Sequence, residues 1–582
     1  MRIANCSGFY GDRLSAALEQ VEGGAIDVLC GDYLAELTMA LLVRDRMRDP
    51  SLGYARTFLL QLRQVLAPCL QKGVRIVVNA GGLNPKGLAA AAREVATELG
   101  LTPSIAWVEG DGVHPRVGEW MASGRTLAHL DTGQTLASSG GMPISANAYL
   151  GCWPIVQALE SGADLVITGR CTDAAVVMAP AAWRHGWKRD DYDALAGALV
   201  AGHIIECGAQ ATGGNHPFYE RVSGLGRVGF PIAEIAADGS SIITKHPGSE
   251  GLVDVDSVTA QLLYEIGSPH YVSPDVIADF GSVSVTQRAP NEVAVGPVRG
   301  LTPPQTLKVG LNVTAGFRNQ VKVLVGGPKL RDKADRVSKA FWQAVGGRDR
   351  FVDTRQELIG GSETPETPTD ALGVLLLSAR SESKDDVGRR FTSAAVELAL
   401  ASVPGLTLLD PPGAPRPCIQ FWPIAVDRDE IPVVVHVDGR ATSVRTTSLQ
   451  NPGIEETLPT FVMDYTPQAC RTAPLGEVAA ARSGDKAGNV NIGIWVTEDG
   501  RMSWLLHTVT AAQVGAWLGV APERVQVYAL PNLRAVNVVV QGWLGLGVGA
   551  SLAADAQGKC LAEFIRTRPV AIPQDWPVVG AG

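Results

Sequence analysis

Short apolar runs alternate with longer amphipathic stretches over roughly the first 230 residues, a pattern typical of alternating strands and helices. The apolar runs are short and rich in β-branched residues, as in buried strands. Strands separated by helices pair in parallel, with helices covering both faces of the sheet. We therefore predict strands at 2–5, 26–30, 74–79, 104–108 and 165–168, and helices at 34–48, at 87–99 and ending at 178.

The pattern changes to a mixed α+β arrangement near residue 300. There we predict neighbouring strands at 307–313 and 320–325, further strands at 351–359 and 372–378, and helices at 333–345 and 390–401. A second boundary is expected near 455–475. Beyond it the pattern predicts strands at 490–496, 504–507, 525–530 and 535–541, and helices at 511–518 and 554–566. The expected domains are therefore 1–300, an extension of that domain at 301–458, and a small domain at 472–575.

The composition is that of an ordinary globular protein, since 46% of the 582 residues are hydrophobic and 19% are charged. A chain of this length needs more than one hydrophobic core. The net charge of −9 contains no basic block, which argues against nucleic acid and membrane as partners. No apolar run reaches the roughly 18 residues of a membrane helix.

Cysteine usage bears on the compartment. The nine cysteines are scattered singly without CxxC spacing, and their odd number argues against a disulfide framework. The first residues form a predicted strand and lack the long apolar run of a signal peptide. We therefore expect a cytoplasmic protein.

Segment 201–216 combines two histidines, a carboxylate, a thiol, two amides and four glycines. His203 and Glu206 are three residues apart, which on a helix places them on one face as a candidate acid–base pair. A capped helix end with a hydrogen-bonded histidine would have the same spacing. Cys207 could act as a nucleophile only with a lowered pKa, and most lone cysteines are small buried apolar groups. The amide of Asn215 could orient a substrate.

Polar residues also follow the predicted parallel strands, at the edge where ligands bind in open α/β sheets. Asn79 ends the third strand, and Arg170 and Asp173 follow the strand at 165–168. Arg170 would strengthen the preference of a helix N-terminus for anions. Asp173 could instead only accept hydrogen bonds from the first helical turn. We predict all three as substrate-binding residues.

A third polar segment lies in the small domain. Arg482 and Lys486 could hold a carboxylate or phosphate, and Asp485 could orient Arg482 or act as a base. Asn489 extends the polar run toward the next strand. The alternative is a turn fastened by salt bridges.

Metal and nucleotide sites have weak support. Asp32, Asp111, His203, Glu206 and His216 could be assembled into a metal site, but nothing matches HExxH or a cysteine cluster. The glycine pair after the third strand lacks GxGxxG and GxxxxGK[ST]. We therefore predict no metal and identify no cofactor, although coenzyme A could belong to the substrate.

Taken together, these segments resemble the acyclic terpene utilisation family over nearly the whole chain. The resemblance implies a large N-terminal domain followed by a ferredoxin-like domain, and a catabolic role near acyl-CoA enzymes that degrade citronellol, geraniol and related branched acids. One departure is Ala487, where relatives commonly have glycine, so this turn is less able to adopt a positive φ. Another is His216–Pro217, where we expect members to vary. The matching stretches are 7–13, 31–39, 79–85, 168–170 with Asp173, 201–216, 482–486 and 544–547.

The expected fold is α/β, with a large N-terminal domain built on a mostly parallel sheet, an α+β extension and a small ferredoxin-like domain. The expected function is a lyase or hydratase step on a branched isoprenoid acid or its CoA thioester. In this hypothesis an anion clamp holds the substrate, amides orient it, and a carboxylate or imidazole moves a proton next to the carbonyl. The clamp comprises Arg170, Arg482 and Lys486; the amides are Asn79, Asn215 and Asn489; the proton carriers are Asp485, Glu206 and His203.

Two alternatives remain open. The chain could be a non-catalytic scaffold or binding subunit, because sheets of ferredoxin-like domains often mediate assembly. A thioesterase or other hydrolase would depend on Cys207. In each case we expect a homo-oligomer, as is usual for soluble catabolic enzymes of this size.

Overall fold

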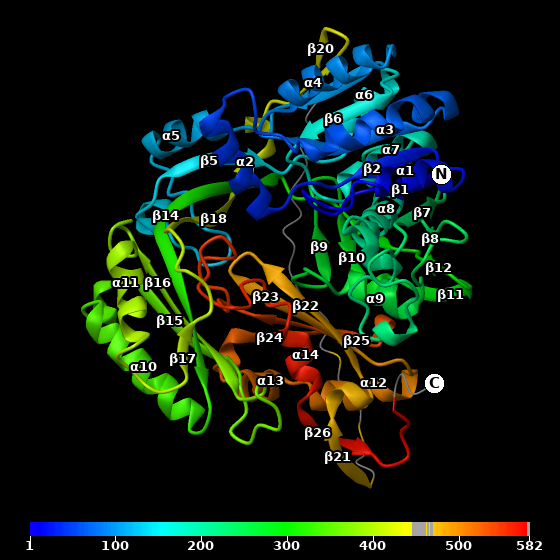
Figure 1. Cartoon of the computed structure of the whole chain (residues 1–582). Coiled ribbons are helices and arrows are strands. Elements are labelled where there is room, and N and C mark those ends of the chain that lie inside the picture. The colour runs from blue at the N-terminus through cyan, green and yellow to red at the C-terminus, as the bar shows by residue number, and fades with distance from the viewer. Residues whose placement is uncertain (445–460, 462–464, 466–468, 579–582) are drawn as a thin grey trace.

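The computed structural model describes residues 1–444, 461, 465 and 469–578 (Figure 1). Parallel strands form the centre of its largest sheet, in the spatial order β1, β2, β3, β6 and β4. Antiparallel strands continue the sheet on both sides, so the sheet is mixed and the α/β class is confirmed. The central strands are β1 (Arg2–Asn5), β2 (Val28–Gly31), β3 (Arg75–Gly82), β6 (Leu165–Gly169) and β4 (Ile105–Glu109). The flanking strands are β7 (Pro231–Ile235), β8 (Ser241–Lys245), β12 (Glu292–Val295) and β11 (Val285–Ala289) beyond β1, and β19 (Val434–Val437) and β20 (Arg440–Ser443) beyond β4.

Both faces of the parallel region are apolar because successive side chains of a strand point in opposite directions. Ala4 and Leu29 pack on one face, whereas Ile3 and Val28 pack on the other. This explains why the strands are continuous apolar runs instead of alternating ones. The first face is covered by α1 (Ala16–Gly23), α3 (Thr57–Lys72) and α4 (Pro85–Glu98), and the second by α5 (His114–Ala122), α6 (Trp153–Glu160), α7 (Ala175–His185) and α8 (Tyr192–Ile205).

The extension is built on one long strand, β14 (Thr306–Gly326). The prediction of two neighbouring strands at 307–313 and 320–325 is therefore wrong. The polar residues between them remain paired, and an irregularity between Thr314 and Phe317 is accommodated by Gly316 at φ +78°. The strands beside β14 are β5 (Pro143–Ala148), β15 (Asp353–Gly360), β16 (Leu372–Ser381), β17 (Leu406–Leu408) and β18 (Arg416–Asp427), with α10 (Leu330–Ala344) and α11 (Arg389–Leu398).

The C-terminal part contains an antiparallel sheet in the order β22, β23, β25 and β24. The strand expected at 504–507 is wrong, because Trp504 and Leu505 lie buried in α12 instead. The last helix begins at 561 and not at 554. The elements are β21 (Cys470–Pro474), β22 (Ala480–Lys486), β23 (Asn489–Trp495), α12 (Met502–Thr508), α13 (Ala511–Leu518), β24 (Val525–Leu530), β25 (Ala535–Val540), α14 (Leu561–Arg566) and β26 (Pro569–Pro573).

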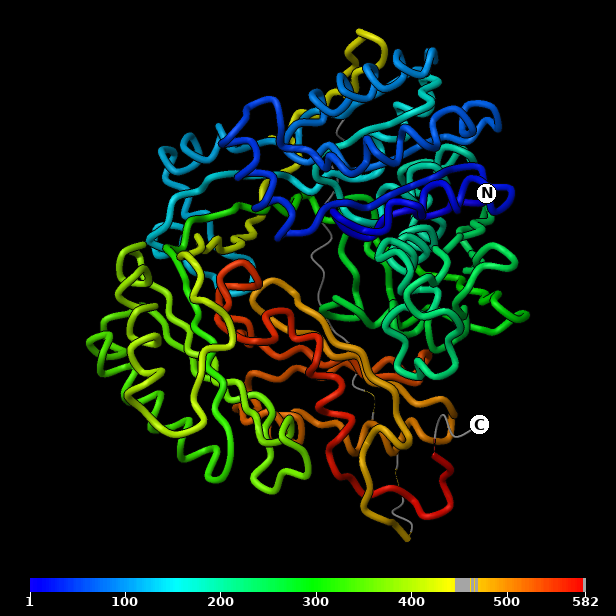
Figure 2. The backbone as a smooth tube through the Cα atoms, in the orientation of Figure 1, coloured from blue at the N-terminus to red at the C-terminus, as the bar shows by residue number. Residues whose placement is uncertain are grey.

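One face of this C-terminal sheet packs against the loop that follows α9 (Val255–Leu262). A Cβ at Gly484 would lie 2.3 Å from the ring of Tyr264, and one at Gly493 would lie 2.3 Å from Cβ of Leu263, so glycine is needed for this close approach. The other face of the sheet packs on its own helices. Figure 2 shows the C-terminal part lying between the N-terminal sheet and the extension. The remaining elements are α2 (Glu36–Arg48), β9 (His270–Val272), β10 (Ile277–Asp279) and β13 (Arg299–Leu301).

The predicted domain limits at 300, 458 and 472 stay predictions, and most of the boundary expected at 455–475 lies outside the described residues. Across the described parts of the chain, no helix is both long and apolar enough to cross a membrane.

Candidate active site

Charged side chains gather where the carboxyl edge of the parallel strands meets the end of β22. Asp32 follows β2 and is buried, with its Oδ1 accepting hydrogen bonds from the Leu34 N–H (3.1 Å) and from Nδ2 of Asn79. The Asn79 Oδ1 accepts a bond of 2.7 Å from the Tyr33 N–H. Burial and the nearby Asp173 carboxylate raise the pKa of Asp32 well above its usual value. Asn79 therefore positions this loop.

Arg170 is the central cation of this group. Its Nη1 lies 2.5 Å from Oδ1 of Asp173, and its guanidinium lies over the ring of Tyr149 at 4.2 Å. The Arg170 N–H donates to Asp111 (2.9 Å), which also accepts from Asn147 (2.8 Å). Burial raises the pKa of Asp111 to about 6. The backbone N–H of Arg170 thus fixes the loop after β6, and the guanidinium of Arg170 remains directed at Asp173 and Tyr149.

The end of α8 supplies His203 and Glu206, which are both buried. His203 Nδ1 lies 3.3 Å from Oε1 of Glu206, so the predicted pairing on one face is found in the structure. Oε2 of Glu206 has no hydrogen-bond partner among the described residues. Burial, followed by Asp173 and Glu265, raises the pKa of Glu206 well above its usual range. Burial, followed by Lys486, lowers the pKa of His203 to about 4. Glu206 therefore holds a proton more readily than a free glutamate does, and His203 is neutral near neutral pH.

The C-terminal part contributes Asp485 and Lys486 at the end of β22. Nζ of Lys486 donates to the carbonyl oxygen of Glu265 (2.9 Å). Burial and Lys308 lower the pKa of Lys486, and burial raises the pKa of Asp485. Oδ1 of Asp485 has no hydrogen-bond partner in the described chain. Lys486 lies near the like-charged Lys308, and Asp485 near the like-charged Glu36, and this repulsion lowers the stability of the folded protein.

Sequence reasoning missed four members of this group, namely Glu36, Glu265, Lys308 and Lys559. Nζ of Lys308 lies 3.6 Å from Oε1 of Glu36 and over the rings of Tyr149 and Phe421. Glu265 has φ +57° and a pKa raised by burial and by Asp485. Lys308 and Glu265 each stand inside an otherwise apolar stretch, and this signal could have identified both.

The cluster is deep but still reached by solvent. Burial raises the pKa of Glu36, yet its side chain keeps 29% of its surface accessible. Lys308 and Asp173 keep 37% and 30%. These groups are thus surrounded by protein but keep part of their surface accessible.

Comparison with protein-family models decides the family. Residues 1–437 match the family described as Acyclic terpene utilisation family protein AtuA, and residues 473–571 match the AtuA ferredoxin-like domain. The chain belongs to the AtuA family. Membership of this family points to acyclic terpene utilisation, and the ferredoxin-like C-terminal domain is confirmed. No curated protein and no solved structure matches the chain.

Other predicted residues of this AtuA family chain lie beside the cluster. Arg482 donates to the Asn215 carbonyl oxygen (3.1 Å) and to Oε1 of Gln210, so it joins β22 to the 208–216 turn. The side-chain oxygen of Asn489 accepts from the Gly542 N–H (2.9 Å) at the far end of the hairpin. Burial and Glu206 raise the pKa of Cys207 well above its usual value, which disfavours a thiolate.

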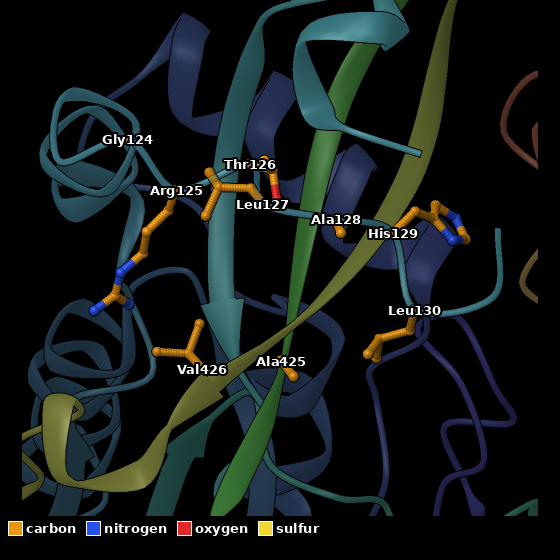
Figure 3. Close-up of a pocket in the computed structure, with 9 residues that line it drawn as sticks. All are labelled: Gly124, Arg125, Thr126, Leu127, Ala128, His129, Leu130, Ala425 and Val426. Atoms are coloured by element: carbon orange, nitrogen blue, oxygen red, sulfur yellow. The ribbon is translucent and has the colours of Figure 1, made fainter. Parts of the chain in front are cut away.

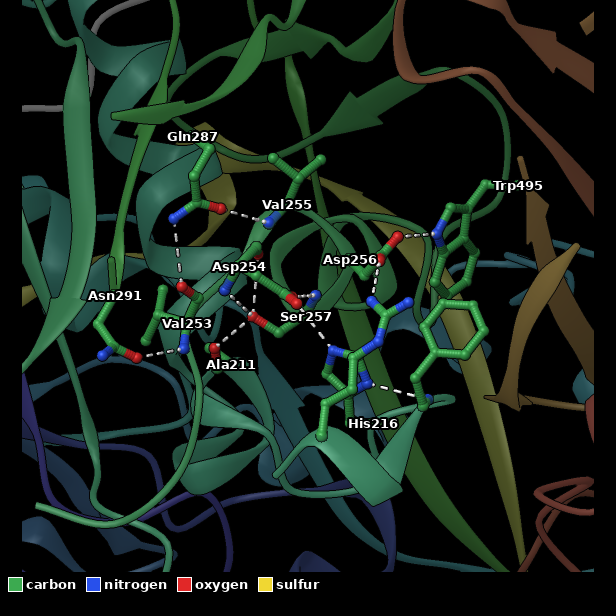
Figure 4. A network of polar contacts seen from close by, with 12 residues as sticks. Ala211, His216, Val253, Asp254, Val255, Asp256, Ser257, Gln287, Asn291 and Trp495 are labelled. Atoms are coloured by element: carbon green, nitrogen blue, oxygen red, sulfur yellow. Dashed lines mark hydrogen bonds and ion pairs between the residues drawn. The ribbon is translucent and has the colours of Figure 1, made fainter. Parts of the chain in front are cut away.

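His216 belongs to a separate network around the start of α9 (Figure 4). Its Nε2 lies 3.1 Å from Oδ1 of Asp254, and its Nδ1 accepts from the Phe218 N–H (2.9 Å). Asp254 and Ser257 form a capping box at this helix end. Nearby, Asp256 accepts a bond of 2.9 Å from Nε1 of Trp495 in the C-terminal sheet.

Neither a metal-binding group nor the cavity beside residues 124–130 coincides with the cluster. Among the described residues, no three His, Cys, Asp or Glu side chains are arranged to hold a metal ion, so Asp32, Asp111, His203, Glu206 and His216 do not form such a group. A cavity of about 600 Å³ lies instead along residues 124–130 and beside Ala425 and Val426 (Figure 3). None of the cluster residues lines it.

Proposed function

We propose that this AtuA family chain is an enzyme that catalyses a lyase or hydratase step on a branched isoprenoid acid or its CoA thioester. The observation that carries the proposal is the buried Glu206, which has an oxygen without a hydrogen-bond partner among the described residues and lies in the field of Arg170 and Lys486. A purely structural carboxylate in such a place would normally be fully hydrogen-bonded. Strongly perturbed groups of this kind gather at functional sites.

Glu206 acts as the proton carrier in this proposal. Because burial raises its pKa, Glu206 keeps its proton more readily than a free glutamate; the acid form can give a proton to the carbon next to a thioester carbonyl, and the conjugate base can remove one. The neutral His203 packs beside Glu206, with its Nδ1 3.3 Å from Oε1, although neither ring nitrogen makes a hydrogen bond among the described residues. Asp485 supplies a second carboxyl group of raised pKa for the hydroxyl or water involved in the same step.

The anion clamp changes in composition from the sequence hypothesis. Arg170 and Lys486 stay in it, and Lys308 joins them because its Nζ lies 3.6 Å from Oε1 of Glu36 and its side chain keeps 37% of its surface accessible. Arg482 is instead engaged with Gln210 and Asn215, so a role in positioning β22 fits it better. Asn79 donates to Asp32, so its role here is to hold that carboxyl group in position. Asn215 and Asn489 are not part of the proposed substrate contacts.

The scaffold alternative loses part of its basis. It relied on an exposed sheet, but the residues of β22, β23 and β25 are mostly buried between their own helices and the loop after α9. Only part of β24 is exposed. The hydrolase alternative is weakened by the raised pKa of Cys207.

Thermal-shift titration tests the proposal. The panel contains geranic and citronellic acids, their CoA thioesters and coenzyme A alone. A ligand that binds only the folded protein stabilises it by about 2.7 kcal/mol at a hundredfold excess over Kd. We expect a shift with the acids or thioesters that is lost in Lys486→Gln and Lys308→Gln but kept in Arg336→Gln, a matched surface control. No shift with any of them would favour a protein-binding role.

A further inference from the structure

The cavity along residues 124–130 lies between this irregular segment and the edge of β18 (Figure 3). The Leu130 N–H donates to the carbonyl oxygen of Pro423 (2.9 Å) and joins the two chains. Among the described residues, no other backbone hydrogen bond connects 124–130 to β18, and the cavity opens beyond this bond, beside Ala425. Its volume of about 600 Å³ is in the range of roughly 300–1,000 Å³ that small-molecule sites have.

Apolar side chains supply most of the lining, namely Leu127, Ala128, Leu130, Ala425 and Val426. Leu130 keeps 50% of its surface accessible, and Ala128 and Ala425 are also exposed. Covering such apolar surface with a hydrocarbon group removes it from water and is favourable. The lining therefore suits a ligand that is apolar over most of its length.

The two ionisable side chains of the lining do not oppose an apolar ligand. Nη1 of Arg125 lies 2.9 Å from Oε1 of Glu430, so this guanidinium is already paired. Nδ1 of His129 accepts a bond of 3.1 Å from the Asp131 N–H. Burial lowers the pKa of His129 against the opposing charge of Asp131, and Lys308 lowers it further, so the ring is uncharged near neutral pH.

The wall formed by the 124–130 segment has a fixed and strained shape. Leu127 adopts φ +47°, which is unfavourable for a leucine. Its carbonyl oxygen accepts a bond of 2.9 Å from Nε1 of Trp422, and the carbonyl oxygen of Thr126 accepts from the Leu136 N–H (3.0 Å). Strain that neighbouring contacts maintain in this way is common at ligand sites.

The cavity and the charge cluster meet on β18. Ala425 is the register partner of Lys308, so their side chains lie on one face with Cβ atoms roughly 4.5–5.5 Å apart. Phe421 and Pro423 share this face with Ala425, because side chains alternate along a strand. Nζ of Lys308 lies 4.9 Å from the ring centroid of Phe421. A row of apolar side chains thus leads from the ammonium group of Lys308 to the cavity.

We propose that this cavity binds the branched hydrocarbon chain of the isoprenoid substrate. The inference rests on the proposed function, in which Lys308 helps to hold the acid or thioester group. From there the chain lies along Phe421 and Pro423 and ends in the cavity. Ala425 and Ala128, on opposite walls, leave the space for it, and larger side chains at either position shorten the chain that fits.

Calorimetric titration of the full chain with three ligands tests the inference. Isovaleric acid has one isoprenoid unit, citronellic acid has two, and citronellol has the two-unit chain without the charge. The wild type should bind citronellic acid at least about tenfold more tightly than isovaleric acid, since each buried CH₂ contributes a factor of about four. It should also bind citronellol. Lys308→Gln should weaken both acids and keep their ratio.

Two variants locate the chain. Ala425→Phe and Ala128→Phe should reduce the ratio of the two acids to within about twofold of one and abolish citronellol binding, while isovaleric acid still binds. Arg336→Gln, which alters an exposed arginine paired with Asp332, should bind all three ligands as the wild type does. Thermal midpoints of each variant verify that it is folded, and the two cavity variants alter separate chain segments.

A tenfold ratio that persists in both cavity variants, or a wild type that does not bind citronellol, would overturn the inference. Failure of the proposed function has a different signature. A chain-length effect that both cavity variants remove, together with acid affinities unchanged in Lys308→Gln or no turnover of any thioester, would keep the hydrocarbon site and refute only the proposed reaction.

Discussion

Two polar groups lie at the junction between the N-terminal and C-terminal parts, and they differ in how completely their members are paired. Around Asp254, each carboxylate has a defined structural role, since Asp254 caps α9 and accepts from His216, and Asp256 accepts from Trp495 (Figure 4). Around Glu206, carboxylates and cations crowd together, and Glu206 and Asp485 each keep an oxygen without a hydrogen-bond partner among the described residues.

The comparison separates two uses of buried polar groups. A network whose members are satisfied fastens one element to another and adds rigidity. A network that leaves acids partly unsatisfied costs stability, and its persistence suggests that the unpaired atoms serve a ligand. The following predictions test this contrast.

The largest expected difference is in catalysis. Glu206→Gln keeps the shape of the side chain and removes its proton chemistry, so we expect turnover of the isoprenoid thioester to fall about 100-fold or more. Asp254→Asn, the matched change in the other network, should leave turnover within about threefold once the protein is folded. Steady-state kinetics of both variants measure this, and equal losses would erase the contrast.

For stability, the larger effect is expected in the network around Asp254 and Asp256. Trp495→Phe keeps the ring packing but removes the Nε1–H donor to Asp256, whose side chain is 13% exposed and also pairs with Arg221 (3.3 Å). Leaving this largely covered acceptor without its donor should cost about 1–3 kcal/mol in the free energy of unfolding. Urea denaturation gives the value. A change below about 0.5 kcal/mol, the size of an ordinary surface substitution, would mean that this bond does not fasten the junction.

The pH dependence of stability should also differ in sign. Because the pKa of Glu206 is raised on folding, the wild type loses stability as pH rises from the usual glutamate value toward the raised one. Glu206→Gln removes this loss, so its gain in thermal midpoint over the wild type should be larger at pH 8 than at pH 5.

Asp254 behaves oppositely. Although burial opposes it, the bond and charge of His216 lower the pKa of Asp254 overall. Its stabilising effect is present above the usual aspartate value and is lost as pH falls through the lowered one. The penalty of Asp254→Asn should therefore be seen at pH 5 to 8 and fade near pH 3, which midpoints over that range would check.

The smallest effect concerns the hairpin that carries Asp485 and Lys486. Ala487 adopts φ +53° in its turn, a conformation that glycine reaches more easily. Ala487→Gly should stabilise the protein by up to about 1 kcal/mol in urea unfolding. Gly488→Ala is the converse control, because its Cβ would lie 2.6 Å from the Gly545 carbonyl oxygen, and it should destabilise.

Sequence patterns located the parallel strands well, because apolar runs such as 165–168 are buried on both faces and carry a strong signal. They failed at α12, where a short apolar run fits a strand or a helix equally. They also divided β14, since polar residues inside a long bent strand look like a loop.

The candidate site was foreseen only in part for a related reason. Arg170, Glu206 and Asp485 stand in loops or at the ends of elements with evident polar chemistry. Lys308 and Glu265 come from apolar segments. The place of Glu265 in the cluster depends on how the C-terminal sheet packs on the loop after α9, and that of Lys308 on how β14 pairs with β5. Such long-range packing leaves no local pattern in the sequence.

The most direct test of the central claim is exchange of the hydrogen next to the thioester carbonyl with solvent deuterium, followed by mass spectrometry. The protein would be incubated in deuterium oxide with an isoprenoid CoA thioester. If Glu206 moves a proton at that carbon, the wild type and Asp254→Asn should both incorporate deuterium, and Glu206→Gln should not. Exchange that is undiminished in Glu206→Gln, or no exchange by a wild type that binds the thioester, would contradict the assignment of this cluster as the catalytic site.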